Sequence, residues 1–127
     1  MSAEIVKALV ATGKWSHETA ELGVAAGFKC EYCGKDFLDS PDTYKLWQVD
    51  HIIPRRADGE DKAENKAIAC RQCNMDFKSR WNPLNAFPKG LNPTREELIE
   101  AVRRYVKGRR EVTKSEIEIA KNIIDGG

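Results

Sequence analysis

Residues 28–34 read Phe-Lys-Cys-Glu-Tyr-Cys-Gly and residues 70–74 read Cys-Arg-Gln-Cys-Asn, and these two stretches decide the fold. They contain every cysteine of the 127-residue chain, arranged as two Cys-x-x-Cys pairs: Cys30 and Cys33, then Cys70 and Cys73. Four thiolates in two such pairs close a tetrahedral zinc site and tolerate a long loop between the pairs. We therefore predict one structural zinc ion that is bound by all four cysteines.

The cysteine pairs have two other interpretations, a redox-active dithiol and a set of disulfides. A thioredoxin-like dithiol is expected near a βαβ pattern, which this sequence lacks. A disulfide framework is expected in a secreted protein, but residues 1–4 show neither a basic segment nor the start of a long apolar run. No stretch approaches the roughly 20 apolar residues of a membrane span. We therefore favour zinc and expect a cytoplasmic protein with no membrane partner.

The whole chain is predicted to form a single α+β domain over residues 1–127. The hydrophobic content of 41% and the charged content of 32% suit a small core that gains stability from a metal. We divide the chain into N-terminal helices, a zinc-stapled core built from a β-hairpin and a helix, and a helical extension. The N-terminal helices occupy residues 1–27, the zinc-stapled core residues 28–81 and the helical extension residues 82–127.

Local sequence patterns place the elements of the core. Residues 36–43 read as a loop, and the β-prone residues 44–49 and 66–69 predict two strands that return on each other. The pattern after the second cysteine pair predicts a helix over residues 71–81, which ends before a proline. The order strand, loop, strand and helix is therefore expected within residues 28–81, together with both cysteine pairs.

The predicted core helix has two distinct faces. Cys73 and Phe77 are four residues apart and share the face expected to point at the zinc and the core. Arg71, Asn74 and Lys78 share a different face, which combines an amide with two cations. We expect that second face to approach phosphate and metal.

The C-terminal region is predicted to hold two helices and most of the basic charge. Residues 94–97 form a Thr-Arg-Glu-Glu capping box, which opens a helix that we expect to end at Gly108. A last helix is expected to begin near residue 113. Residues 78–114 carry ten basic and four acidic side chains, a local charge of +6 in a chain of net charge +1. Such a block suits phosphate binding.

The residues between the cysteine pairs carry the chemistry. Residues 49–54 read Val-Asp-His-Ile-Ile-Pro. Asn65 lies 14 residues after His51, and Asn74 lies nine residues after Asn65. This combination resembles the HNH endonuclease family, also called the ββα-metal nucleases, over about residues 28–80. Many members of that family add a zinc site from two Cys-x-x-Cys pairs. The chain departs from the commoner pattern at Asn74, where a histidine is more frequent.

The resemblance implies a role for each motif residue. His51 is the candidate general base, since an imidazole with an ordinary pKa of about 6.5 accepts a proton at neutral pH. Asp50 and Asn74 are the candidate ligands of a catalytic divalent ion, and their oxygen atoms favour Mg²⁺ or Mn²⁺. Asn65 resembles the family residue that orients the loop by hydrogen bonding. Because Asp50 and His51 are neighbours on a strand, their side chains are expected to point to opposite faces unless the strand ends there.

The expected partner is DNA, and four cations are candidates for phosphate contacts. These are Arg55, Arg56, Arg71 and Lys78. The predicted function is metal-dependent hydrolysis of DNA phosphodiester bonds, with one strand cut per motif, so a double-strand break would need a dimer or two encounters. The alternatives are a non-catalytic zinc module that binds nucleic acid and a zinc-stabilised protein adaptor. Neither alternative has a use for the combination of Asp50, His51 and Asn74.

Overall fold

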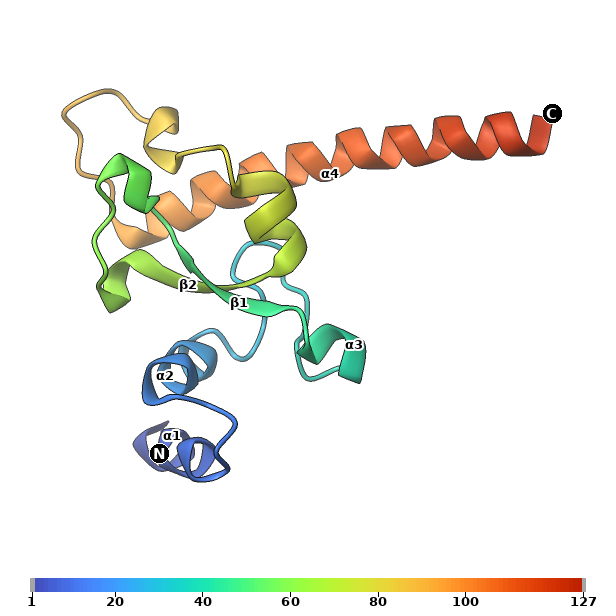
Figure 1. The fold of residues 1–127 in the computed structure, drawn as a ribbon. Coiled ribbons are helices and arrows are strands. Elements are labelled where there is room, and N and C mark those ends of the chain that lie inside the picture. The colour runs from blue at the N-terminus through green and yellow to red at the C-terminus, as the bar shows by residue number, and fades with distance from the viewer. Residues whose placement is uncertain (1, 127) are drawn as a thin grey trace.

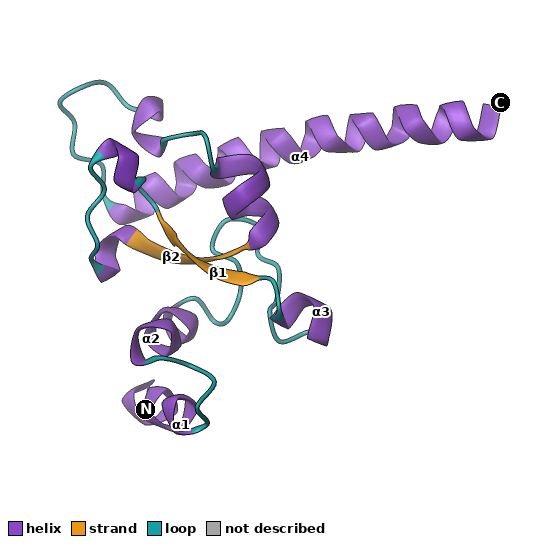
Figure 2. Cartoon of the chain, in the orientation of Figure 1, coloured by secondary structure: helices purple, strands orange, loops and turns teal. Residues whose placement is uncertain are grey.

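The computed structural model describes residues 2–126, and its helices surround a single two-stranded antiparallel sheet (Figure 1 and Figure 2). The main elements are α1 (Ser2–Ala11), α2 (His17–Ala25), α3 (Pro41–Tyr44), β1 (Trp47–His51), β2 (Lys66–Cys70), η3 (Gln72–Lys78) and α4 (Arg95–Gly126). Three short 3₁₀ turns are η1 (Arg55–Ala57), η2 (Ala63–Asn65) and η4 (Pro83–Ala86). The predicted α+β class and the hairpin-plus-helix core are confirmed.

The hairpin holds residues from both predicted sites. Strands β1 and β2 pair with Trp47 opposite Cys70 and His51 opposite Lys66. All five residues of β2 are buried, because α2 lies on one side of the strand and η3 follows directly from its end. One end of the hairpin therefore carries a cysteine of the zinc site, and the other end carries the Asp-His pair.

The core helix η3 is a π-helix and not the α-helix predicted over residues 71–81. A π-helix closes its hydrogen bonds between residues five apart. Lys78 therefore lies one turn beyond Cys73 and is buried with it, at 3% exposure. Of the three residues predicted to share the second face, Asn74 and Lys78 line one cavity, and Arg71 is exposed and lies outside it.

The first strand begins later than predicted, because residues 41–44 form the short helix α3. Ser40 caps this helix by accepting a hydrogen bond from the backbone N–H of Thr43, and Pro41 occupies its first turn. A serine followed by a proline is a helix-start signal. Strand β1 then continues to His51, so Asp50 and His51 both belong to it and their side chains point to opposite faces.

Helix α4 is one continuous helix of 32 residues and not the two helices predicted. Gly108 does not end it, since a helix-interior glycine costs only about 1 kcal/mol and good helix formers flank this one. The first half packs on the core through buried residues such as Val102 and Val106. In Figure 1 the second half extends past the rest of the molecule, and its isoleucines are exposed there.

The N-terminal helices cover the hairpin from the other side. Ser16 caps α2, and Trp15 before it stacks on Trp47 with ring centroids 4.6 Å apart. Helix α1 lies against α2 at the edge of the molecule (Figure 1). Across residues 2–126, none of the helices combines the length with the apolar composition that a bilayer crossing requires.

Candidate functional site

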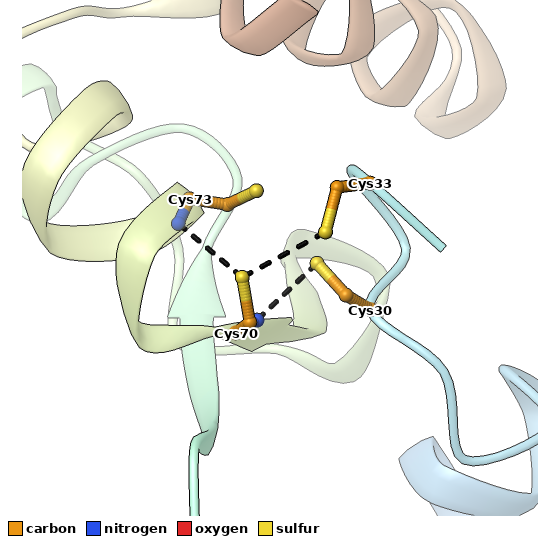
Figure 3. A group of neighbouring side chains, drawn as sticks. All are labelled: Cys30, Cys33, Cys70 and Cys73. Carbon is orange, nitrogen blue, oxygen red and sulfur yellow. Dashed lines mark hydrogen bonds between the residues drawn. The ribbon is translucent and has the colours of Figure 1, made fainter. Parts of the chain in front are cut away.

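The four cysteines converge on one point although two of them come from a loop and two from the hairpin and η3. Their sulfur atoms all lie within 4.8 Å of one another. Figure 3 shows Cys30 and Cys33 approaching from one side and Cys70 and Cys73 from the other. Cys30, Cys70 and Cys73 are buried, while Cys33 is exposed.

The geometry of this cysteine cluster fits zinc. The Cys33 and Cys70 sulfur atoms are 3.8 Å apart, and a tetrahedral site with Zn–S bonds of about 2.3 Å has an edge of about 3.8 Å. A disulfide needs a separation of about 2.05 Å. Hydrogen bonding with the Cys30 thiol lowers the pKa of Cys33 and raises that of Cys73, so the four close thiols differ in how readily they ionise. The ligand type, number and spacing are therefore those of a structural zinc site.

Backbone hydrogen bonds hold the first cysteine pair in a tight knuckle. Gly34 has a φ of 80°, and its N–H donates to the carbonyl of Cys30 over 2.8 Å. Backbone N–H groups also point at sulfur: that of Cys70 at Cys30 Sγ over 3.2 Å, and that of Cys73 at Cys70 Sγ over 3.4 Å. Such donors stabilise thiolates and help to orient the ligands.

Arg110 of α4 closes the cysteine cluster from the remaining side. Its guanidinium donates to Cys73 Sγ over 3.3 Å and to the side-chain oxygen of Gln72 over 2.9 Å, and it lies 5.2 Å from the ring centroid of Phe77. Its cationic charge offsets part of the negative charge of the thiolates. Arg110, which belongs to the basic block of residues 78–114, is thus engaged by groups of the protein itself.

A second, smaller site lies at the far end of the hairpin, in a cavity of about 260 Å³. We call it the hairpin pocket. Its lining residues are Val49, Asp50, His51, Pro54, Arg55, Arg56, Asn74, Lys78 and Ser79. Most of the predicted catalytic and phosphate-binding residues therefore meet here, although Asp50 and His51 lie on opposite faces of β1. Arg71 is exposed and lies outside the lining.

Asp50 stands at the buried side of the hairpin pocket and is 8% exposed. Its Oδ2 atom accepts a hydrogen bond from the Tyr32 hydroxyl over 2.6 Å and an ion pair from Lys78 Nζ at 3.0 Å. Lys78 Nζ also donates to the backbone carbonyl of His51 over 3.0 Å. Burial lowers the pKa of Lys78, whereas the Asp50 charge acts to raise it. The phosphate contact of Lys78 stays a prediction, and in this structure its ammonium group binds Asp50 and the His51 carbonyl.

His51 stands at the open side of the hairpin pocket and contacts Asp61. Its Nε2 atom is 3.0 Å from Asp61 Oδ1 and 3.4 Å from Arg55 Nε. Asp61 also pairs with Arg55 at 3.3 Å and with Lys66 at 3.0 Å. The hydrogen bond to His51, followed by that to Lys66, lowers the pKa of Asp61 well below its usual range. The Asp61 carboxylate therefore contacts three basic side chains.

Asn65 fastens the loop that follows His51. Its side-chain oxygen accepts from the backbone N–H of Ile53 over 2.8 Å, and its amide nitrogen donates to the carbonyls of Ile53 and Glu60. The loop is tight here, since a Cβ atom built on Gly59 would lie 1.7 Å from the Ile53 carbonyl oxygen. Asn65 therefore holds the two ends of the loop together and does not line the hairpin pocket itself.

Asn74 and the two arginines complete the pocket. The Asn74 amide nitrogen donates to Gln48 Oε1 over 2.8 Å, which leaves its carbonyl oxygen as the acceptor for a cation. Arg55 is tied to Asp61, whereas Arg56 forms no ion pair among residues 2–126. Asn74 on η3 and Asp50 on β1 thus bring two oxygen donors to one cavity.

Four residues that contact the predicted site residues were not identified from the sequence: Tyr32, Gln48, Asp61 and Arg110. Tyr32 lies between two cysteines and looks like part of the knuckle alone, and Asp61 lies in a loop rich in exposed charge. Only Gln48 offered a signal, since it is two residues before Asp50 and shares its strand face.

A larger cavity of about 750 Å³ lies between the knuckle and α4. Lys35, Arg103 and Lys107 line it beside Cys33. It contains neither a histidine nor an asparagine. The hairpin pocket is the cavity that combines a candidate base with candidate metal ligands.

Comparison with known proteins identifies a family over the centre of the chain. Residues 30–80 match the family model described as HNH endonuclease. The resemblance inferred from the sequence is therefore confirmed for this segment, which spans both cysteine pairs, the hairpin and η3. Searches of curated proteins and of solved structures give no significant match.

Proposed function

We propose that this protein is a metal-dependent endonuclease that hydrolyses DNA phosphodiester bonds in the hairpin pocket. The observation that carries the proposal is that one cavity gathers Asp50, His51 and Asn74, with Arg55 and Arg56 at its edge. Phosphodiester hydrolysis needs a base, a cation near the leaving oxygen and positive charge around the phosphate. The residues of the pocket offer all three in one place, within the segment that matches the HNH endonuclease model.

His51 serves as the general base in this proposal. The contact of its Nε2 atom with Asp61 is shorter than the contact with Arg55, which favours a proton on Nε2 that is donated to the carboxylate. Nδ1 is then the unprotonated nitrogen, and it has no hydrogen-bond partner among residues 2–126. The proton of an attacking water therefore passes to Nδ1.

Asp50 and Asn74 are the residues that would hold a divalent ion. Asp50 Oδ2 is occupied by Tyr32 and Lys78, so the ligand atoms are Asp50 Oδ1 and the carbonyl oxygen of Asn74. Oxygen donors of this kind suit Mg²⁺ or Mn²⁺, which when bound would stabilise the charge that develops on the leaving oxygen. Arg55 and Arg56 supply the remaining positive charge for the phosphate.

The cysteine cluster has a structural role in this proposal. A zinc ion with four protein ligands has no open position for substrate. Its position, joining the knuckle to β2 and η3, supports the elements that carry Asp50 and Asn74. A cytoplasmic location, where cysteines stay reduced, and dimer formation for double-strand cleavage belong to the same proposal.

Plasmid cleavage tests the proposed function. Supercoiled plasmid is incubated with the protein and Mg²⁺, Mn²⁺ or EDTA, and the nicked and linear forms are measured over time. The wild type is expected to nick DNA only with a divalent ion, and His51→Ala is expected to be about 10²- to 10⁴-fold slower with its fold unchanged.

A matched control separates the pocket from general effects of losing a histidine. His17→Ala removes an exposed histidine that pairs only with Glu21, at 2.7 Å. This variant is expected to cleave like the wild type. DNA binding without metal-dependent cleavage by the wild type would reject the enzyme in favour of a non-catalytic nucleic-acid-binding module.

A further inference from the structure

Tyr32 connects the two sites of the molecule. It is the second residue between Cys30 and Cys33, so a predicted zinc ligand lies on either side of it within two residues. Its side chain is 3% exposed, and its hydroxyl donates to Asp50 Oδ2 over 2.6 Å. The knuckle of the cysteine cluster therefore reaches directly to the candidate metal-binding carboxylate.

The knuckle is also fastened to the hairpin that carries Asp50. The backbone N–H of Glu31 donates to the Ile68 carbonyl over 3.0 Å, and the Glu31 carboxylate accepts from the Ile68 N–H over 3.0 Å. Arg95 of α4 binds the same carboxylate at 2.9 Å. Because Ile68 pairs with Val49 across the hairpin, the Tyr32 hydroxyl and Asp50 share one rigid frame.

Both partners of Asp50 bind the same oxygen atom of its carboxylate. Tyr32 and Lys78 both bind Oδ2, and Oδ1 forms no hydrogen bond within residues 2–126. A carboxylate fixed through one oxygen cannot rotate about its terminal bond without breaking both contacts. Oδ1 is thereby kept in one orientation, on a residue that lines the hairpin pocket.

We propose that Tyr32 is a positioning residue through which the zinc knuckle orients Asp50 for a divalent cation. The inference deepens the proposed function, because it rests on Asp50 as a ligand of the catalytic ion. Tyr32 itself touches neither substrate nor cation. It acts by fixing the oxygen that the cation does not use.

The test is direct binding of Mn²⁺ to zinc-loaded protein, measured by the electron paramagnetic resonance signal of free Mn²⁺. The wild type is compared with Tyr32→Phe, which removes only the hydroxyl, and with Asp50→Asn, which defines the binding that depends on the carboxylate. Tyr105→Phe is the matched control, because Tyr105 stacks on Trp81 outside the hairpin pocket. Zinc content is measured for each protein, and plasmid nicking is titrated with Mg²⁺ in parallel.

Tyr32→Phe is expected to bind Mn²⁺ about 3- to 10-fold more weakly, the loss typical of one ordinary hydrogen bond, because Lys78 still holds the same oxygen. Half-maximal nicking should need more Mg²⁺ by a similar factor, with one zinc retained and the control unchanged. Unaltered Mn²⁺ affinity in Tyr32→Phe would overturn the inference. Loss of zinc from this variant would also overturn it, since the hydroxyl would then support the cysteine cluster instead.

The two proposals can fail separately. If the wild type binds Mn²⁺ through Asp50 but nicks no DNA, the proposed function fails and the Mn²⁺ affinities still decide the role of Tyr32. If Mn²⁺ binding is the same in the wild type and in Asp50→Asn, the inference fails whatever the cleavage assay shows.

Discussion

The cysteine cluster and the hairpin pocket are built in different ways, although one hairpin carries parts of both. In the cluster, four identical ligand atoms converge within 4.8 Å and need little else to define the site. In the pocket, each candidate residue has a partner of another kind: Tyr32 and Lys78 for Asp50, and Asp61 for His51. The first site depends on ligand type and spacing, and the second depends on tertiary neighbours.

This difference predicts how the two sites respond to mutation. Loss of a cysteine removes a quarter of the ligands of an ion that holds the fold together. Loss of a residue that contacts Asp50 or His51 leaves the motif residue in place, but its side chain is then free to change orientation.

Cys70→Ser is expected to unfold the domain. Structural zinc in small domains contributes on the order of 10 kcal/mol, which is comparable with the whole stability of a typical domain. Circular dichroism on heating and elemental analysis of the purified protein measure the two effects. A variant that keeps one zinc per chain and unfolds cooperatively at the wild-type temperature would contradict the structural role of the cluster.

Asp61→Asn is expected to slow cleavage by about 3- to 10-fold while the fold stays intact, because His51 loses a charged hydrogen-bond partner. Since its pKa in the folded protein is lowered, Asp61 is ionised at all pH values above about 4. Its stabilising effect is lost only as the pH falls below that value, so the carboxylate is present in the wild type throughout the range from pH 6 to 8, where the rates are compared.

Glu60→Gln is the matched control for this prediction. Glu60 is the neighbouring exposed carboxylate, and its side chain pairs only with Lys62, at 3.3 Å. Equal rates for Asp61→Asn and Glu60→Gln would show that His51 needs no anionic partner.

Arg110→Met is expected to release zinc to a chelator about 3- to 10-fold faster, because the thiolates lose a charge-assisted donor. The variant keeps all four ligands, so it separates the surroundings of the cluster from the ligands themselves. Zinc transfer to a coloured chelator gives the rate, and Arg104→Met on the exposed side of α4 is the control. If both variants release zinc at the wild-type rate, α4 has no part in holding the ion.

Arg56→Gln is expected to have the smallest effect, on the salt dependence of DNA binding. Each phosphate contact on duplex DNA contributes about 0.9 to the slope of log affinity against log salt concentration. The slope should fall by about that amount, with no loss of thermal stability. Lys121→Gln, near the end of α4, should leave the slope unchanged; an equal change in both variants would assign binding to overall charge and not to the hairpin pocket.

The sequence was most informative where local chemistry decides the structure. The cysteine spacing predicted the cluster, and β-prone residues predicted the hairpin within about three residues at each end. The roles of Asp50, His51, Asn65 and Asn74 stay predictions, since their placement alone does not measure catalysis. Nothing in the sequence showed that Tyr32 would meet Asp50, 18 residues away, because that contact exists only once the knuckle lies against the hairpin.

The errors have physical causes of the same kind. The burial of Lys78 does not follow from an α-helical pattern, because the wider winding of η3 turns the side chain inward beside Asp50. Gly108 predicts a helix end, but the good helix formers on either side continue α4 through it. In both cases tertiary packing or the neighbouring residues outweigh the local pattern on which the prediction rests.

The position of the cysteine pairs along the chain has a consequence for biosynthesis. Cys33 and Cys70 are 37 residues apart, and closing a flexible loop of that length costs roughly 3 kcal/mol of chain entropy. Both pairs and every residue that lines the hairpin pocket precede residue 80, whereas α4 begins at Arg95. The whole zinc-binding segment of a growing chain therefore emerges before Arg110 does, and zinc capture can precede the docking of α4.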